Sequence, residues 1–141
     1  MAELDALPEW PPGTAAILGT AGGAPHAIPV STAYRAGPRT ILFALARRRE
    51  SLERLRTDPR CALTVLAAPD LAFTAHGRAV IVEDPMAAAG RVAALRLDVE
   101  SVQDHTHAAF TIEAGVRWRW TDRDAEAADA QVRAALAALA R

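Results

Sequence analysis

Short apolar runs separated by glycine- and proline-rich turns open the chain and predict antiparallel strands. The runs cover residues 14–20, 26–34 and 40–46. Gly22 and Gly23, between the first two runs, permit the positive φ of a tight hairpin turn. Pro29 inside the second run has no N–H to donate, so that run requires an edge position or a bulge. The pattern predicts a three-stranded meander.

The apolar period changes from about two to about 3.6 beyond residue 49, which predicts a helix over residues 50–57. Asp58-Pro59 ends this helix, because the residue before a proline disfavours helical geometry. Two further apolar runs predict the fourth and fifth strands. They cover residues 61–68 and 71–83. Gly77 inside the second of these runs indicates a bulge.

The last third of the chain reads as helix, strand and helix. Asp84 offers an N-cap and Pro85 a first-turn proline, which predicts a helix over residues 85–97. Residues 106–120 alternate in part and predict a sixth strand. An alanine- and leucine-rich stretch predicts a final amphipathic helix over residues 124–140.

Together these elements predict a protein that is mainly β with α, a six-stranded antiparallel β-barrel with peripheral helices. Residues 1–13 contain three prolines and a glycine around Trp10 and predict an N-terminal arm. Residues 14–141 are expected to form a single domain with a C-terminal helix, because 141 residues suit one domain of ordinary size.

Charge and cysteine content narrow the expected partners and compartment. A net charge of −1 gives no overall attraction to nucleic acid or to an anionic membrane. Cys61 is the single cysteine, which excludes an intramolecular disulfide and a cysteine-rich metal site. No apolar run approaches the ~18 residues of a membrane helix, and no secretory leader opens the chain. We therefore expect a cytoplasmic protein without nucleic-acid or membrane partners.

Three consecutive arginines stand where the third apolar run meets the helix over residues 50–57. Arg47, Arg48 and Arg49 are followed by Ser51 and by the free N–H groups of the first helical turn. Guanidinium groups and a helix N-terminus together suit a phosphate or another polyanion. The sequence indicates an anion-binding turn, and the alternative is a solvated basic loop.

The candidate metal ligands are the four histidines, His26, His76, His105 and His107. The last two could lie on one strand face beside Asp104. A closed site needs three or four converging ligands, so surface or interface histidines are the alternative, and no metal is expected. The chain contains neither a G-x-S-x-G motif nor a dinucleotide-binding glycine pattern, so no catalytic nucleophile is assigned.

Several short pieces of the chain share their order and spacing with one known family. They are the G-x-P-x-x-x-P-V arrangement from Gly23 to Val30, the strand end Phe43-Ala44, the helix end L-R-x-D-P-R at residues 55–60 and H-G-R-A-V-I-V-E-D at residues 76–84. In this order they resemble the FMN-binding split-barrel group, the pyridoxamine 5′-phosphate oxidase-like superfamily, over roughly residues 14–120. The resemblance implies that the barrel is a split barrel.

In that family a dimer of split barrels holds two flavins at the subunit interface, with the phosphate where the third strand meets the short helix. The resemblance implies that the phosphate end comprises Arg47, Arg48, Arg49, Glu50 and Ser51, with backbone contacts from Ala44 and Leu45. It places the ring against Val30, Ser31 and Thr32. Many members have a hydroxyl residue followed by a basic one where this chain reads Arg49-Glu50-Ser51.

The resemblance further implies a flavin- or deazaflavin-dependent oxidoreductase acting on a small organic substrate. The cofactor would be FMN or, alternatively, the 8-hydroxy-5-deazaflavin coenzyme. A non-catalytic flavin- or haem-binding protein for storage or sensing is the alternative function. We expect a two-fold homodimer that buries Trp118 or Trp120 together with parts of the strands over residues 26–34 and 61–68, and Trp118 is the candidate contact to the ring edge.

Overall fold

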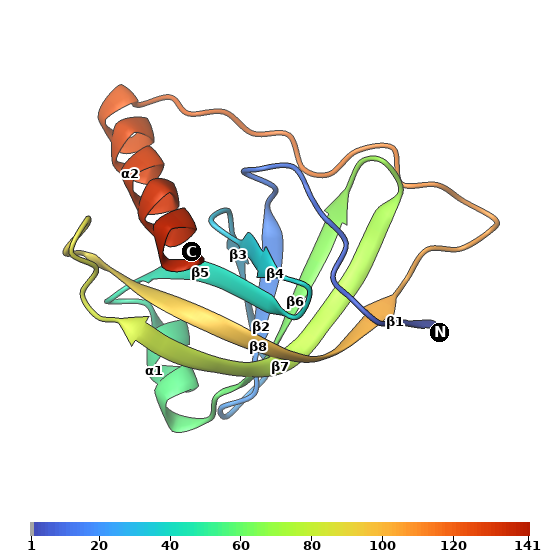
Figure 1. The fold of residues 1–141 in the computed structure, drawn as a ribbon, viewed down its shortest axis with the longest axis horizontal. Helices are drawn as coiled ribbons and strands as arrows, with labels where there is room; N and C mark the ends of the chain where they lie inside the picture. Colours follow the sequence, from blue (N-terminus) through green and yellow to red (C-terminus); the bar gives the residue numbers. More distant parts are fainter. Residues whose placement is uncertain (1) are drawn as a thin grey trace.

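The structure is a computed structural model that describes residues 2–141. Figure 1 shows its strands as one curved sheet with both helices at the periphery. The strands are β1 (Ala2–Leu4), β2 (Ala16–Thr20), β3 (His26–Val30), β4 (Tyr34–Gly37), β5 (Thr40–Ala46), β6 (Arg60–Ala67), β7 (Leu71–Glu83) and β8 (Val92–Asp104). The helices are α1 (Glu50–Thr57) and α2 (Arg123–Leu139).

The strands of residues 2–141 form a single antiparallel sheet in the order β3-β2-β6-β7-β8-β5-β4, and β1 pairs with β8 beside this path. β3 and β4 are the two ends of the path and do not pair with each other, so the sheet is not closed. The prediction of a mainly β fold with peripheral helices is confirmed. The prediction of six strands is wrong, because the described sheet has eight.

The second predicted strand, over residues 26–34, is divided in two. β3 ends at Val30 and β4 begins at Tyr34, so the two predicted hairpins form separately, one between β2 and β3 and the other between β4 and β5, and the continuous three-stranded meander does not. Pro29 stands opposite Ile17 and leaves β3 an edge strand, as a residue without an N–H requires. β5 pairs with β4 and β8 instead of with β3.

The predicted helix over residues 85–97 is wrong, because most of its second half belongs to β8. This strand is paired along its length with β7 and over residues 92–98 also with β5. Leu95, Leu97 and Val99 alternate with charged residues and fill the core. Strand pairing on both sides overrides the helical propensity of the alanine-rich stretch that precedes them.

The predicted sixth strand over residues 106–120 is also wrong, because this segment forms none of the named strands. It runs outside the sheet toward α2 (Figure 1). The N–H of Asp70 donates to the carbonyl of Ile112, and the N–H of Ile112 donates to the Asp70 carboxylate. Gly115 lies so close to the carbonyl oxygen of Leu66 that a Cβ would collide with it. β6 pairs with β7 along its length but with β2 only over residues 61–64, and the segment passes Leu66 beyond that pairing without forming a named strand.

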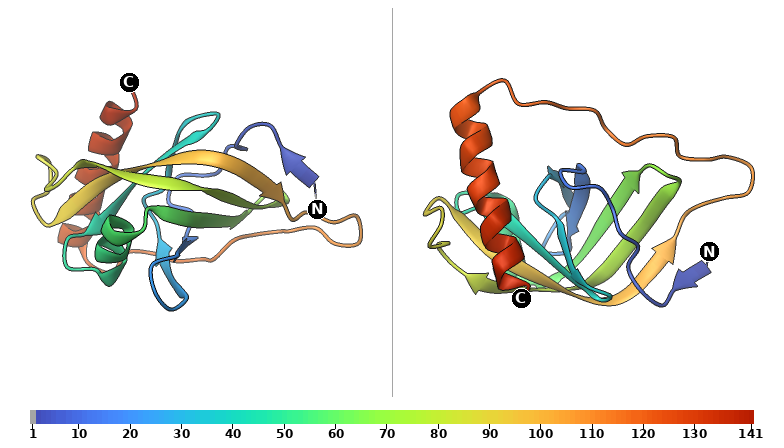
Figure 2. Two further views of the ribbon diagram at one scale, coloured as in Figure 1. Left: turned by 90° about the horizontal axis from the view of Figure 1, so that it is seen from below. Right: turned by 45° about the horizontal axis from the view of Figure 1, so that its top comes forward.

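Two clusters of buried side chains hold these elements together. The larger cluster fills the concave side of the sheet and includes Phe43 and Phe73, which are fully buried. The smaller cluster lies on the other face of β5 and β8, where Val132 and Leu136 of α2 pack near Ala44. The right panel of Figure 2 shows α2 lying across this part of the sheet.

The helices predicted over residues 50–57 and 124–140 are confirmed as α1 and α2. The predicted bulge at Gly77 is confirmed by a shift of the β7–β8 register between His76 and Gly77. Neither helix within residues 2–141 combines the length and apolarity needed to cross a bilayer.

The arm predicted over residues 1–13 can be followed from Ala2, and residue 1 lies outside the described residues. Its first residues form β1, and Leu7 is buried. The Trp10 ring packs on Phe73 with 5.7 Å between ring centroids, and its indole N–H donates to the carbonyl of Ala33 at 3.1 Å. Trp10 therefore anchors the arm to the sheet.

Candidate functional site

The turn between β5 and α1 carries the three consecutive arginines. β5 is buried along most of its length and emerges at Ala46. α1 begins at Glu50, and its N-cap residue Arg49 makes no side-chain capping bond. The N–H of Arg47 donates to the carbonyl of Arg91 at 3.0 Å, which ties this turn to the turn between β7 and β8.

The Arg47 guanidinium already has an acidic partner. Its Nε lies 2.6 Å from Oδ1 of Asp84, and Arg56 binds the other carboxylate oxygen. These hydrogen bonds, that of Arg56 foremost, lower the pKa of Asp84, so the group is a carboxylate at neutral pH. The carboxylate of Asp84 pairs with both guanidiniums, so Arg47, Arg56 and Asp84 together carry one net positive charge.

Arg48 and Arg49 are exposed, and within residues 2–141 their side chains make no hydrogen bond or ion pair. A surface hollow of about 740 Å³ opens at this turn. It is lined by Ala46, Arg47, Arg48, Gly90 and Arg91. Sequence reasoning missed Arg91, because the predicted helix hid the β5–β8 pairing that sets Ala46 opposite Val92. We call this the arginine hollow.

Glu50 and Ser51 face away from the arginines that precede them. The Glu50 carboxylate lies 2.6 Å from Nε of Arg54 and 3.5 Å from Nδ1 of His26, and the Arg54 hydrogen bond lowers its pKa. The Ser51 hydroxyl is fully buried, 3.1 Å from Nε2 of His26. A serine without exposed surface cannot attack a substrate, so this cluster ties α1 to the β2–β3 hairpin.

Residues 30–32, which are predicted to hold the flavin ring, lie where the chain passes from β3 to β4, the two ends of the open sheet. Val30 is buried in the core, and Ser31 is partly exposed. The Thr32 hydroxyl accepts from the N–H of Ala44 at 3.0 Å and donates to its carbonyl at 3.3 Å. Thr32 and Ala44 therefore lie side by side, while Leu45 is buried in the core.

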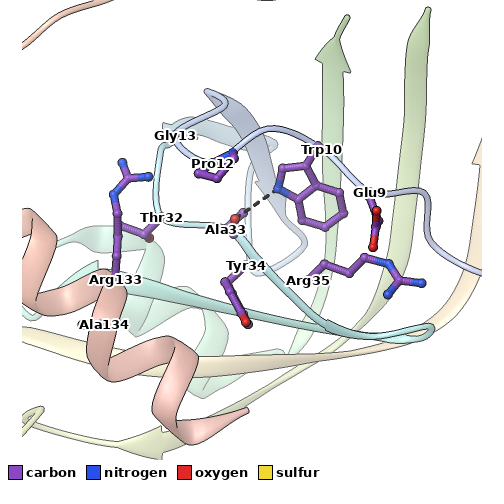
Figure 3. A pocket seen from close by; sticks show the side chains of 10 residues that line it. All are labelled: Glu9, Trp10, Pro12, Gly13, Thr32, Ala33, Tyr34, Arg35, Arg133 and Ala134. Carbon is purple, nitrogen blue, oxygen red and sulfur yellow. Dashed lines mark hydrogen bonds between the residues drawn. The ribbon is translucent and has the colours of Figure 1, made fainter. Parts of the chain in front are cut away.

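A second hollow, of about 450 Å³, lies directly above residues 32–35 (Figure 3). One wall is the arm at Trp10 and Pro12, and the opposite wall is α2 at Arg133. The floor is the backbone and side chains from Thr32 to Tyr34. Of these residues the sequence pointed only to Thr32, because the other walls come from segments distant in the chain. We call this the arm–helix hollow.

Trp118 does not lie at the arginine hollow. Its indole N–H donates to the carbonyl of Gly13 at 2.9 Å, and its ring meets Trp120 edge-on with 5.3 Å between centroids. Together with Arg133, these groups line a neighbouring hollow of about 400 Å³. Trp118 therefore fastens the segment after β8 to the arm.

The predicted absence of a metal site stays a prediction. Nε2 of His105 lies 2.7 Å from the Thr74 hydroxyl, while the His107 ring stacks on Phe110. Among the described residues no three histidine, cysteine or acidic side chains converge as metal ligands. Burial raises the pKa of the Cys61 thiol to about 12, so this cysteine carries no thiolate at neutral pH.

A family model described as pyridoxamine 5′-phosphate oxidase matches residues 5–117. The chain belongs to this family. No curated protein sequence matches it. The match of the oxidase family covers every strand from β2 to β8, together with α1 and the arginine hollow, and it ends before α2. Arg133 therefore lies outside the part of the chain that the oxidase family shares.

Solved structures support the same fold. A putative pyridoxamine 5′-phosphate oxidase from Lactobacillus delbrueckii matches with a TM-score of 0.59 at 20% identity, covering 72% of this chain and 98% of its own. An FAD-binding protein from Mesorhizobium loti matches at 0.52 and 15% identity, covering 66% and 87%. A heme-binding protein from Mycobacterium smegmatis matches at 0.51 and 19% identity, covering 64% and 48%. At these identities the likeness concerns the fold.

Proposed function

We propose that this protein is a flavin- or deazaflavin-dependent oxidoreductase that acts on a small organic substrate. The observation that carries the proposal is the arginine hollow, in which cationic side chains from two turns surround one surface depression. The family match adds support, because solved proteins of this fold include one named for FAD binding. FMN is the proposed cofactor, and the 8-hydroxy-5-deazaflavin coenzyme is the alternative.

The residues at the arginine hollow fit a phosphate group. Arg48 and Arg91 line the hollow and make no side-chain ion pair within residues 2–141, so their guanidiniums remain for a ligand, and Arg49, equally unpaired, follows Arg48 in the chain. Glu50 is turned toward Arg54 and therefore does not oppose an anion. Each charge-assisted hydrogen bond to a phosphate contributes ~1.5–3 kcal/mol.

When bound, FMN would supply the hydride and electron transfer, for which the protein needs no acid–base pair of its own. The protein itself would bind the cofactor and orient it toward the substrate. Arg47, Arg48 and Arg49 form the proposed phosphate end, with Glu50 and Ser51 turned away from it toward Arg54 and His26, and backbone groups of Ala44 and Leu45 lead along β5 toward Thr32. Val30, Ser31 and Thr32 form the proposed ring side, with Trp118 at the ring edge.

We further propose that the protein acts as a two-fold homodimer. Ile17 and Leu66 are 45% and 48% exposed on neighbouring strands, and Val116 is 71% exposed beside them. They surround an apolar hollow of about 340 Å³ that also touches Pro29 and Thr64. This surface includes parts of β3 and β6, the strands for which the sequence predicts dimer contacts.

The absorption spectrum of the purified protein tests the cofactor proposal. We expect a yellow protein, or a colourless one that binds added FMN or deazaflavin with one cofactor per chain and a perturbed flavin spectrum. If both flavins keep their free spectra at concentrations well above that of the protein, the proposal is wrong.

A non-catalytic flavin- or haem-binding protein is the second candidate, and the position of Ser51 favours it. The hydroxyl is fully buried against His26, so it is withdrawn from the phosphate end that it would serve in a flavin enzyme. A solved protein of this fold is named for heme binding. A shifted haem absorption band, with unchanged flavin spectra, is the result that favours this candidate.

A further inference from the structure

Three segments outside the main sheet path meet above residues 32–35. The turn of the arm places Gly13 at a φ of +79°, and the Trp118 indole binds its carbonyl. The guanidinium of Arg133 on α2 lies against the same glycine, 3.3 Å from where a Cβ would stand. The arm and α2, the two walls of the arm–helix hollow, therefore come close together at Gly13.

Arg133 stands between the arm–helix hollow and the neighbouring hollow, with its guanidinium beside Pro12 and Gly13 (Figure 3). Arg133 uses Nε to bind Asp129, and within the described chain its two Nη groups have no hydrogen-bond partner. Arg35 uses Nε to bind the carbonyl of Leu7 at 3.0 Å. Figure 3 shows Arg35 directed away from Arg133, toward the side where Glu9 lies.

The lining therefore carries two arginines and one glutamate, a single net positive charge. Asp129 further offsets the charge of Arg133. With Asp129 counted, these four groups sum to zero, so the hollow has no excess positive charge to hold a dianion, and an anion there must be recognised through hydrogen bonds. The paired Nη groups of one arginine also fit the two oxygens of a carboxylate.

The uncharged part of the lining is flat and rigid. Trp10 is fixed by its ring contact with Phe73 and by its bond to Ala33. Tyr34 is 40% exposed, and its hydroxyl has no partner among residues 2–141. Pro12 completes the arm wall (Figure 3). A volume of about 450 Å³ with an apolar, aromatic lining and a few polar groups is typical of small-molecule sites.

We propose that the arm–helix hollow binds a small aromatic carboxylate, with its carboxylate on the Nη groups of Arg133 and its ring against Trp10 and Tyr34. That this ligand is the substrate rests on the proposed function, because Thr32 belongs both to the hollow and to the proposed ring side. The binding site itself stands without it.

Calorimetric titration of the purified protein without flavin tests the site. The probes are 2-naphthoate, its uncharged isostere 2-naphthamide, and the saturated decahydro-2-naphthoate. We expect one 2-naphthoate per chain, bound at least tenfold more tightly than either of the other two. Equal affinity for acid and amide would overturn the carboxylate assignment, and equal affinity for the aromatic and saturated acids would overturn the aromatic one.

Variants distinguish a role of Arg133 in ligand binding from an effect on the folding of α2. Arg133→Gln should weaken 2-naphthoate at least tenfold, to the level of the amide, and leave the amide unchanged, whereas Arg133→Lys should retain most of the affinity. Arg123→Gln, an exposed arginine on the same helix, is the control and should bind as the parent does. Unchanged binding in Arg133→Gln would overturn the proposal.

Tyr34→Leu gives a second test that does not touch α2. We expect it to weaken 2-naphthoate at least fivefold and to leave decahydro-2-naphthoate unchanged, and equal effects on both would count against the ring contact. Because no flavin is present, naphthoate binding without FMN binding would overturn the proposed function alone. FMN binding without naphthoate binding would overturn this site alone.

Discussion

At the scale of residues, the arginines around α1 divide into those that hold the fold and those that remain for a ligand. Arg54 binds Glu50 and the carbonyls of the β2–β3 turn. Arg47 and Arg56 share Asp84. Arg48 and Arg49 have no such partner within residues 2–141. Of the three consecutive arginines, Arg47 therefore stabilises the fold, whereas Arg48 and Arg49 remain available to a ligand.

We predict that replacing Arg48 and Arg49 together by Ala weakens FMN binding by roughly two to four orders of magnitude, since each lost charge-assisted contact costs ~1.5–3 kcal/mol. The free energy of unfolding should change by less than about 0.5 kcal/mol, because both side chains are exposed. Fluorescence titration of FMN and urea unfolding measure the two quantities. Arg117→Ala with Arg119→Ala, a second exposed pair, is the control. Affinity within threefold of the parent would show a merely solvated loop.

Two glycines offer a matched test of backbone packing. A Cβ on Gly77 would collide with the carbonyl oxygen of Asp98 across the bulge, whereas a Cβ on Gly90 would meet nothing within 4 Å. We expect Gly77→Ala to lower the free energy of unfolding by roughly 3 kcal/mol, since the strands must separate locally. Gly90→Ala should change it by less than about 0.5 kcal/mol. Urea unfolding checks both, and equal effects would contradict this account of the bulge.

At the scale of elements, the local sequence pattern correctly predicts the helices and strands whose tertiary surroundings suit that pattern. β5, α1, β7 and α2 follow the predicted bounds to within a residue. The alanine-rich stretch before β8 predicts a helix, although Leu95, Leu97 and Val99 alternate as a strand requires. Residues 106–120 carry β-forming side chains, yet they join no named strand. Propensity alone does not decide whether a segment finds a strand partner.

The same limit applies to the sites. Arg47 to Ser51 are contiguous, so the sequence alone could mark them as a group. Arg91 reaches the arginine hollow only through the β5–β8 register, and Arg133 reaches the arm–helix hollow only through the packing of α2. The burial of Ser51 against His26 likewise depends on the β2–β3 hairpin folding toward α1. These relations are tertiary and leave no local pattern.

Asp58, between α1 and β6, should make the free energy of unfolding depend on pH. The hydrogen bond from Arg60 foremost lowers the pKa of Asp58 from 3.8 to about 2. A carboxyl with a lower pKa in the folded chain stabilises the fold above its unfolded pKa, and this stabilisation is lost as pH falls through the folded pKa. The difference in unfolding free energy between the parent and Asp58→Asn should therefore be constant above about pH 5 and shrink toward pH 2. Urea unfolding at several pH values measures it, and a constant difference down to pH 2 would contradict the prediction.

At the scale of the whole molecule, the described surfaces have distinct characters. The arginine hollow lies at the β5–α1 corner, and the arm–helix hollow lies above the seam between β3 and β4. The apolar surface around Ile17 and Leu66 belongs to β2 and β6. The apolar hollow and the arginine hollow share no lining residue, so a second copy seated on the apolar hollow does not use the arginines themselves.

The last prediction concerns that apolar surface. A specific interface buries about 800 Å² per partner, close to a tenth of the 8036 Å² exposed by this chain, so it must extend beyond Ile17, Leu66 and Val116. A charge placed at its centre should break it, because a buried unpaired charge costs several kcal/mol. We expect the parent to scatter light as a species of twice 15.0 kDa at micromolar concentration and Leu66→Glu to be monomeric. Val80→Glu, at another exposed apolar position, should remain dimeric. A monomeric parent would contradict the homodimer, whereas a monomeric Leu66→Glu that no longer binds FMN would indicate that the cofactor site needs both subunits.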